Sequence, residues 1–174
     1  MQNLKCSDTL SISNHRVFSS DLNEHNTVFG GKTLMTIDDN SSISASRIAR
    51  IETVTASIDQ VNFILPFGLQ DSMCTESYVS GVGSRSIEVF TKIIGEHLKT
   101  GKRFLGLTCF STFVVTDKSI VLPSIVPDSD EAEYVCSGYQ KRQSERLEKL
   151  LEQEKFNQNI SLKFPWQIKK DQKS

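Results

Sequence analysis

The sequence predicts an α+β fold in which one long helix precedes an antiparallel sheet. The first observation is a segment at residues 32–49 whose small and apolar side chains recur at helical spacing. The second is that the following segments, as far as residue 116, alternate like strands and are separated by short turns, with no further helix between them. Short turns join antiparallel strands, whereas parallel strands need long crossovers, so we expect an antiparallel sheet.

The predicted helix has one stripe of side chains that contains a carboxylate. Asp38 lies on this stripe while the adjacent Asp39 lies on the next one, so the two carboxylates point in different directions. The stripe consists of Leu34, Asp38, Ser41, Ala45 and Ile48. An alternative stays open, because residues 38–42 also have the composition of a loop that caps a shorter helix starting near Ile43.

Gly30 and Gly31 stand where the helix is expected to begin. The first N–H groups of a helix lack partners within it and carry partial positive charge, so this turn suits a polarised carbonyl or a developing oxyanion. Residues 26–33 also match the phosphate-binding pattern GxxxxGK(S/T) except at its first glycine. That motif follows a buried parallel strand, which residues 17–22 do not resemble, so a P-loop nucleotide hydrolase is the less favoured interpretation.

Strand-like and then charged segments make up the rest of the chain. Strands are expected at residues 54–65, 73–80, 86–95 and 103–116, with turns at residues 81–83 and 98–101. Beyond Pro127 the charged composition predicts a solvated helix that continues to Lys155, with Leu147, Leu150 and Leu151 as its apolar side. Residues 164–174 show no pattern, and we expect them to form a docking tail or to be disordered.

The composition argues against several classes of function. The formal net charge is -1 and the basic residues are scattered, which disfavours nucleic-acid and membrane-surface partners. No run has the length of a transmembrane helix and the N-terminus lacks the apolar centre of a signal peptide, so we expect a cytoplasmic protein. The 4 cysteines are widely spaced and predict buried or incidental thiols, and with only 3 histidines no metal site is expected.

Several short segments, taken in order, resemble the bacterial single-domain acyl-CoA thioesterases of the hotdog fold. They are residues 21–31, 35–39, 54–59, 63–66 and 83–89. The resemblance implies a hotdog domain over residues 8–126, in which an antiparallel sheet wraps around one long central helix. It also implies a charged C-terminal helix and tail over residues 127–174. The family usually has glycine at the position of Asn26, so the chain departs from the pattern there.

The resemblance further implies an activity, the hydrolysis of acyl-CoA to free CoA and a carboxylic acid in fatty acid metabolism. No cofactor is implied beyond the CoA that is part of the substrate and product. The functional pair of the family matches Asn23, which would position water or substrate, and Asp38, which would act as general base or nucleophile. A backbone N–H near Gly31 would polarise the thioester carbonyl, with Gly30 beside it.

Further residues and an assembly complete what the resemblance implies. Thr55 or Ser57 would orient Asp38 from the neighbouring strand, and Arg85 and Ser86 would contact CoA. Such proteins form homodimers whose sheets join edge to edge, commonly three dimers to a hexamer, and the asparagine and aspartate of one site come from different subunits. A non-catalytic hotdog protein that binds acyl-CoA as a regulator is the alternative.

Overall fold

The computed structural model describes residues 3–117 and 119–164, which belong to two compact units. The first unit is Met1–Ser137 and the second is Gly138–Ser174. The sequence led us to expect a domain boundary after residue 126, whereas the first unit also includes helix α2 (Asp130–Ser137). The expectation of a docking tail concerned residues 164–174, of which 165–174 lie outside the described residues.

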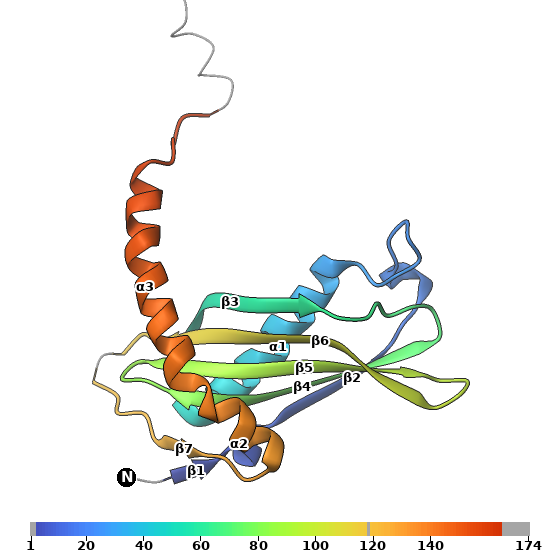
Figure 1. Ribbon diagram of the computed structural model, residues 1–174, viewed down its shortest axis with the longest axis horizontal. Helices are drawn as coiled ribbons and strands as arrows, with labels where there is room; N and C mark the ends of the chain where they lie inside the picture. The colour runs from blue at the N-terminus through green and yellow to red at the C-terminus, as the bar shows by residue number, and fades with distance from the viewer. Residues whose placement is uncertain (1–2, 118, 165–174) are drawn as a thin grey trace, which may run out of the picture. The chain divides into compact units, whose positions relative to one another are not determined.

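One antiparallel sheet of five strands forms the body of the first unit (Figure 1). The strands are β2 (Ser11–Arg16), β3 (Thr53–Phe63), β4 (Asp71–Val82), β5 (Ser86–His97) and β6 (Lys102–Val115). Their order in the sheet is β2-β4-β5-β6-β3, so β2 and β3 are its edges. The expected antiparallel sheet is confirmed. Strand β2 was not predicted, because Ile12 is its single apolar residue.

Helix α1 (Gly30–Ala49) lies along one face of this sheet (Figure 1). The predicted long helix is confirmed, and the alternative of a shorter helix starting near Ile43 is wrong. In the disputed stretch, the hydroxyl of Ser41 donates to the carbonyl of Ile37 at 2.6 Å, and that of Ser42 to the carbonyl of Asp39 at 2.8 Å. These hydroxyls bond to the preceding helical turn, so they do not compete with the helix by capping a loop.

The buried face of α1 is rotated from the predicted stripe. Ile37 and Asn40 are buried against the sheet, whereas Leu34 is exposed and Asp38 is half-buried. The amide of Asn40 fixes this rotation, because its Nδ2 donates to Ser77 Oγ on β4 at 2.7 Å. Asp38 therefore lies at the rim of the contact between helix and sheet, where solvent reaches it.

Smaller elements complete the first unit. The short helices η1 (Cys6–Thr9) and η2 (Ser19–Asp21) flank β2, and β1 (Asn3–Lys5) pairs in parallel with β7 (Ser124–Val126). Helix α2 contributes Ala132 and Val135 to an apolar cluster with Tyr78 of the sheet. The side chain of Tyr78 projects from the face of the sheet opposite to α1, so both faces carry a buried core.

The second unit contains helix α3 (Tyr139–Gln158). This helix has no buried residue, and Leu147, Leu150 and Leu151 are each at least 60% exposed. The predicted charged C-terminal helix is confirmed. It is separate from α2, which ends at Ser137, because the chain passes through Gly138 between them.

Candidate active site

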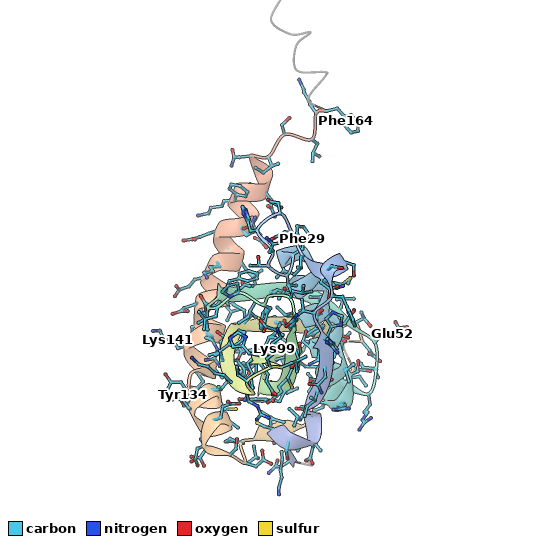
Figure 2. The ribbon with its side chains drawn as sticks, turned by 90° about the vertical axis from the view of Figure 1, so that its right-hand side faces the viewer. Phe29, Glu52, Lys99, Tyr134, Lys141 and Phe164 are labelled. Atoms are coloured by element: carbon cyan, nitrogen blue, oxygen red, sulfur yellow. The ribbon has the colours of Figure 1, made fainter. Side chains whose placement is uncertain are left out.

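The start of α1 presents two backbone N–H groups to solvent. The carbonyl of Phe29, a residue labelled in Figure 2, accepts hydrogen bonds from the N–H groups of Lys32 and Thr33 at 3.0 and 3.2 Å. Among the described residues, no acceptor binds the N–H groups of Gly30 and Gly31. They lie at the positive end of the helix dipole, so they can donate to an oxygen of a ligand.

The loop before α1 is closed by the side chain of Asn23. Its Oδ1 accepts hydrogen bonds from the N–H groups of His25 at 2.9 Å and Thr27 at 3.2 Å. Asn26 has a φ of 59°, in the left-handed region that asparagine tolerates better than most residues other than glycine. The departure from the usual glycine is therefore compatible with a tight turn. The side-chain NH₂ of Asn23 has no acceptor within the described residues and remains a donor.

A buried carboxylate anchors this loop to the helix. Asp21 is 2% exposed and bonds to the Lys32 ammonium, the Phe18 N–H at 2.8 Å and the ring Nε2 of His15 at 2.6 Å. The hydrogen bonds from Lys32 and Phe18 hold the pKa of Asp21 well below its usual range. Lys32 is thus engaged by a carboxylate rather than available to a phosphate. Together with the antiparallel sheet, this excludes the P-loop interpretation.

Asp38 is paired with a threonine of the edge strand. The hydroxyl of Thr55 donates to Asp38 Oδ1 at 2.8 Å. Ser57 instead donates to Asp59 Oδ2 at 2.6 Å, with no hydrogen bond to Asp38. Of the two residues that we expected to orient the aspartate, the structure brings Thr55 to it and not Ser57.

A β-bulge separates Thr55 from Ser57. Thr55 pairs with Phe113 of β6 and Ser57 pairs with Thr112, so Ala56 is an extra residue without a partner. Residues opposite each other in an antiparallel pair have side chains on the same face. Phe113 is buried in the core that α1 covers, so Thr55 faces α1 and Ser57 faces away from it. Strict alternation along residues 54–59 would instead place Thr55 and Ser57 on the same face of the strand.

Arg85 and Ser86 lie far from the glycine turn within one chain. Ser86 begins β5, and the next residue, Ile87, belongs to the same buried cluster as Ile48 in the last turn of α1. A helix of 20 residues such as α1 is about 30 Å long. One chain therefore holds the predicted residues in three separate groups: the glycine turn with Asn23, the Asp38 pair, and the start of β5.

An apolar cavity of about 290 Å³ lies beside the glycine turn. It is lined by Thr27, Val28, Gly30, Thr33, Phe63, Ile64, Leu65, Pro66 and Phe67. The cavity was not predicted from the sequence, because segments far apart in the chain form it. A usable signal was the apolar run at residues 63–67, which continues beyond the end of β3 at Phe63. The cavity can take an alkyl group next to the N–H groups of Gly30 and Gly31.

Within residues 3–117 and 119–164, no three His, Cys, Asp or Glu side chains gather as metal ligands would. No helix in the same part of the chain is both long enough and apolar enough to cross a membrane. All four cysteines are free thiols, and burial raises the pKa of Cys109 to about 12, so this thiol stays protonated.

Comparison with known proteins gives the family. Residues 25–102 match the Thioesterase superfamily. The chain is 43% identical over 164 residues to the uncharacterised acyl-CoA thioester hydrolase YkhA of Bacillus subtilis, which covers 92% of this chain and 95% of the relative. The crystal structure of an acyl-CoA hydrolase from Bacillus cereus matches with a TM-score of 0.88 and 35% identity, over 92% of this chain and 100% of the other.

An acyl-CoA hydrolase of Staphylococcus aureus, solved with butyryl-CoA, CoA and CoA disulfide, matches with a TM-score of 0.85 and 28% identity over 90% of this chain and 98% of the other. Other structures of that enzyme carry alanine in place of an asparagine, an aspartate or a threonine. These three residues follow one another at the same intervals as Asn23, Asp38 and Thr55.

An apo-hexameric acyl-CoA thioesterase matches with a TM-score of 0.81 and 29% identity, over 86% of this chain and 98% of the other. In each case the likeness extends over most of both chains. The long helix against an antiparallel sheet is the hotdog arrangement that these enzymes share. The chain therefore belongs to the acyl-CoA thioester hydrolases of the thioesterase superfamily.

Proposed function

We propose that two copies of this chain together form a site that hydrolyses acyl-CoA to free CoA and a carboxylic acid. The observation that carries the proposal is the position of the Gly30 and Gly31 N–H groups beside an apolar cavity. A thioester carbonyl matches the donors, and the attached alkyl chain matches the cavity. The proposed setting is the cytoplasm, and the reaction uses water with no cofactor besides the CoA of the substrate.

The edge strand β3 supports a site shared between two copies. It pairs with β6 on one side only, which leaves its other backbone edge open to a second strand. Exposed apolar side chains lie near this edge, on β3 at Val54 and on α1 at Met35, one turn before the Asp38 that bonds to Thr55 of β3. Joining the β3 edges of two copies would bury them and would bring Asp38 of one copy toward the glycine turn of the other. Three such dimers would give a hexamer.

The proposed reaction begins with the thioester carbonyl bound by a backbone N–H near Gly31. These donors stabilise the negative charge that develops on the carbonyl oxygen, and the loss of one such donor typically lowers the rate about 10² to 10³-fold. Asn23 of the partner loop positions water or the carbonyl through its side-chain NH₂. Thr55 holds Asp38 Oδ1, which leaves the other carboxylate oxygen for chemistry.

Two routes fit this arrangement. In the first, Asp38 takes a proton from water, the water oxygen attacks the carbonyl carbon, and CoA leaves as a thiolate that is then protonated. In the second, the carboxylate attacks the carbonyl carbon and the C–S bond breaks, which releases CoA as a thiolate that is then protonated; water hydrolyses the resulting mixed anhydride to the carboxylic acid and the free Asp38 carboxylate. Hydrolysis of one equivalent of substrate in H₂¹⁸O separates them, because only the second route can place ¹⁸O in the Asp38 carboxylate.

The residue assignments have support from a related enzyme and from the chemistry of phosphate binding. The Staphylococcus aureus hydrolase was altered at an asparagine, an aspartate and a threonine at the intervals of Asn23, Asp38 and Thr55. Arg85 and Ser86 are proposed to bind the phosphates of CoA, since a guanidinium and a hydroxyl are suitable donors for phosphate oxygens. Their distance from Gly31 within one chain is compatible with CoA spanning two copies.

The test is release of CoA thiol from straight-chain acyl-CoA esters by the wild type, Asp38→Ala and Asn23→Ala. Asp39→Ala is the matched control, because it removes the neighbouring exposed carboxylate on another face of α1. We expect a loss of at least about 10²-fold for Asp38→Ala, the usual contribution of a general base, and little change for Asp39→Ala. Unfolding and refolding a mixture of the two inactive variants should restore part of the activity, since mixed dimers contain one intact site.

Three outcomes would count against the proposal. Absence of thiol release by the wild type from every ester would overturn the hydrolase and favour the acyl-CoA-binding regulator. Full activity in Asp38→Ala would remove the assigned base. Failure of the mixture to recover activity, with mixed dimers demonstrated by mass spectrometry, would place each site within one chain.

A further inference from the structure

We propose that Phe67 limits the length of the acyl chain that this enzyme accepts, and that Gly106 holds the Phe67 ring in place. The inference rests on the proposed function, because it assigns the acyl group to the cavity beside the glycine turn. Phe67 lines that cavity and is 4% exposed. It also belongs to the buried apolar cluster that contains Ile37 and Leu107. The Phe67 ring is therefore the wall between the cavity and the core.

The ring lies directly on a glycine of the sheet. A Cβ at Gly106 would be 2.0 Å from the Cζ of Phe67, so no larger residue fits under the ring in its present position. The ring of Phe104 packs against it with centroids 5.7 Å apart, and that ring lies over Gly95 in the same way, at 2.1 Å. Two glycines thus create the space for a pair of aromatic rings, of which Phe67 lines the cavity and Phe104 does not.

The backbone around Phe67 is fixed on both sides. The N–H groups of Ile64 and Leu65 both donate to the carbonyl of Gly106, at 2.8 and 3.2 Å. The carbonyl of Phe67 accepts from the N–H of Val28, another lining residue, at 2.9 Å. Because residues 64–67 are held to β6 and to the loop before α1, the ring cannot move away by a shift of the chain. The backbone of the wall is therefore fixed, and the Phe67 ring can turn only about its own side-chain bonds.

The lining indicates which acyl groups fit. Within the described part of the chain no charged side chain lines the cavity, and the hydroxyls of Thr27 and Thr33 are already bonded to Asn23 Oδ1 and to the carbonyl of Phe29. A polar group on the acyl chain would lose its hydration without gaining a partner, so unsubstituted alkyl chains are favoured. One water occupies about 30 Å³ in the liquid, and we take the same volume for each heavy atom of an alkyl chain. The cavity of about 290 Å³ therefore holds on the order of ten such atoms.

The experiment measures kcat/KM for straight-chain acyl-CoA esters from acetyl to palmitoyl. For the wild type we expect kcat/KM to rise about fourfold for each methylene that enters the cavity. The rise should end near the chain length at which the acyl group reaches Phe67. Phe67→Leu shortens the wall, so the rise should continue by about two methylenes and the ratio of long-chain to short-chain activity should increase about 16-fold. Gly106→Ala pushes the ring away from the sheet and should end the rise at a shorter chain.

Phe104→Leu is the matched control, because Phe104 belongs to the same ring pair but does not line the cavity. Thermal melting establishes that each variant is folded. Phe67→Leu and Gly106→Ala are expected to shift the preferred chain length in opposite directions, so either variant alone tests the proposal if the other unfolds. An unchanged chain-length profile in both, or an equal shift in Phe104→Leu, overturns the assignment of Phe67 and leaves the hydrolase intact. Absence of thiol release by the wild type would overturn the proposed function itself.

Discussion

Replacing Thr55 by valine tests whether the hydroxyl on the edge strand positions Asp38. Valine keeps the branched shape that suits a strand and removes the donor that lies 2.8 Å from Asp38 Oδ1. A hydrogen bond to a charged group contributes about 1.5–3 kcal/mol. Thr55 is exposed in the isolated chain, so the lower end of this range applies, and about 1.5 kcal/mol corresponds to a loss of about tenfold in kcat.

The assay is steady-state thiol release with the best straight-chain substrate, with kcat and KM determined separately. Thr55→Ser keeps a hydroxyl and should recover most of the rate. Thr53→Val removes a hydroxyl from the same strand, away from Asp38, and should have little effect. We expect the Thr55→Val change in kcat rather than in KM, because the carboxylate and not the substrate loses its partner. Equal rates for Thr55→Val and the wild type, or equal losses for the valine and serine variants, would refute the positioning role.

Three further predictions concern stability and thiol chemistry. The pKa of Asp21 is lowered in the folded protein, so its contribution to stability is present above about pH 4 and is lost on acidification. In urea unfolding, the free energy of unfolding of Asp21→Asn should therefore depend less on pH than that of the wild type between about pH 4.5 and pH 2. Gly101 has a φ of 69°, so Gly101→Ala should lower the free energy of unfolding by about 1 kcal/mol in the same assay. The Cys6 and Cys136 sulfurs are 3.7 Å apart, but contact with Cys136 and burial raise the pKa of Cys6, so mild peroxide at neutral pH should leave the Cys6 thiol unoxidised, as peptide mass spectrometry would show.

The helix could be predicted from sequence because its pattern is long and local. The uncertainty at residues 38–42 arose because serine, aspartate and asparagine stabilise both caps and helices that bury polar contacts. In the folded chain the hydroxyl of Ser44 donates to the carbonyl of Ser77 at 2.9 Å, and Asn40 bonds to the same strand. These contacts join α1 to β4, which is distant in sequence. They stabilise the helix through tertiary structure, which local preferences do not describe.

The strands show where a sequence pattern is insufficient. Strand β2 has little apolar character and is held at a sheet edge by pairing with β4, so no local pattern marks it. The bulge at Ala56 changes which side chains face α1, and alternation alone gives no sign of it. The pairing partner determines the face, and that partner, Phe113, is more than fifty residues away.

The candidate site was predictable to a similar extent. The glycine turn and Asp38 are visible in the sequence, because a helix start and a carboxylate on a helix have local signatures. The cavity was not predictable, since it forms only when residues 63–67 cross over the start of α1. The contact between Cys6 and Cys136 was also missed, because their separation of 130 residues leaves no local sign.

The pairing of β1 with β7 has a consequence for the order in which the protein is made. The side chains of Asn3 and Ser124, which join the two strands, are 121 residues apart. At about 5–20 residues per second, a ribosome needs on the order of ten seconds to synthesise the interval. During that time the first strand emerges without its partner, while the residues of α1 and the large sheet are already being added. The N-terminal strand is therefore among the last parts of the first unit to reach its native position.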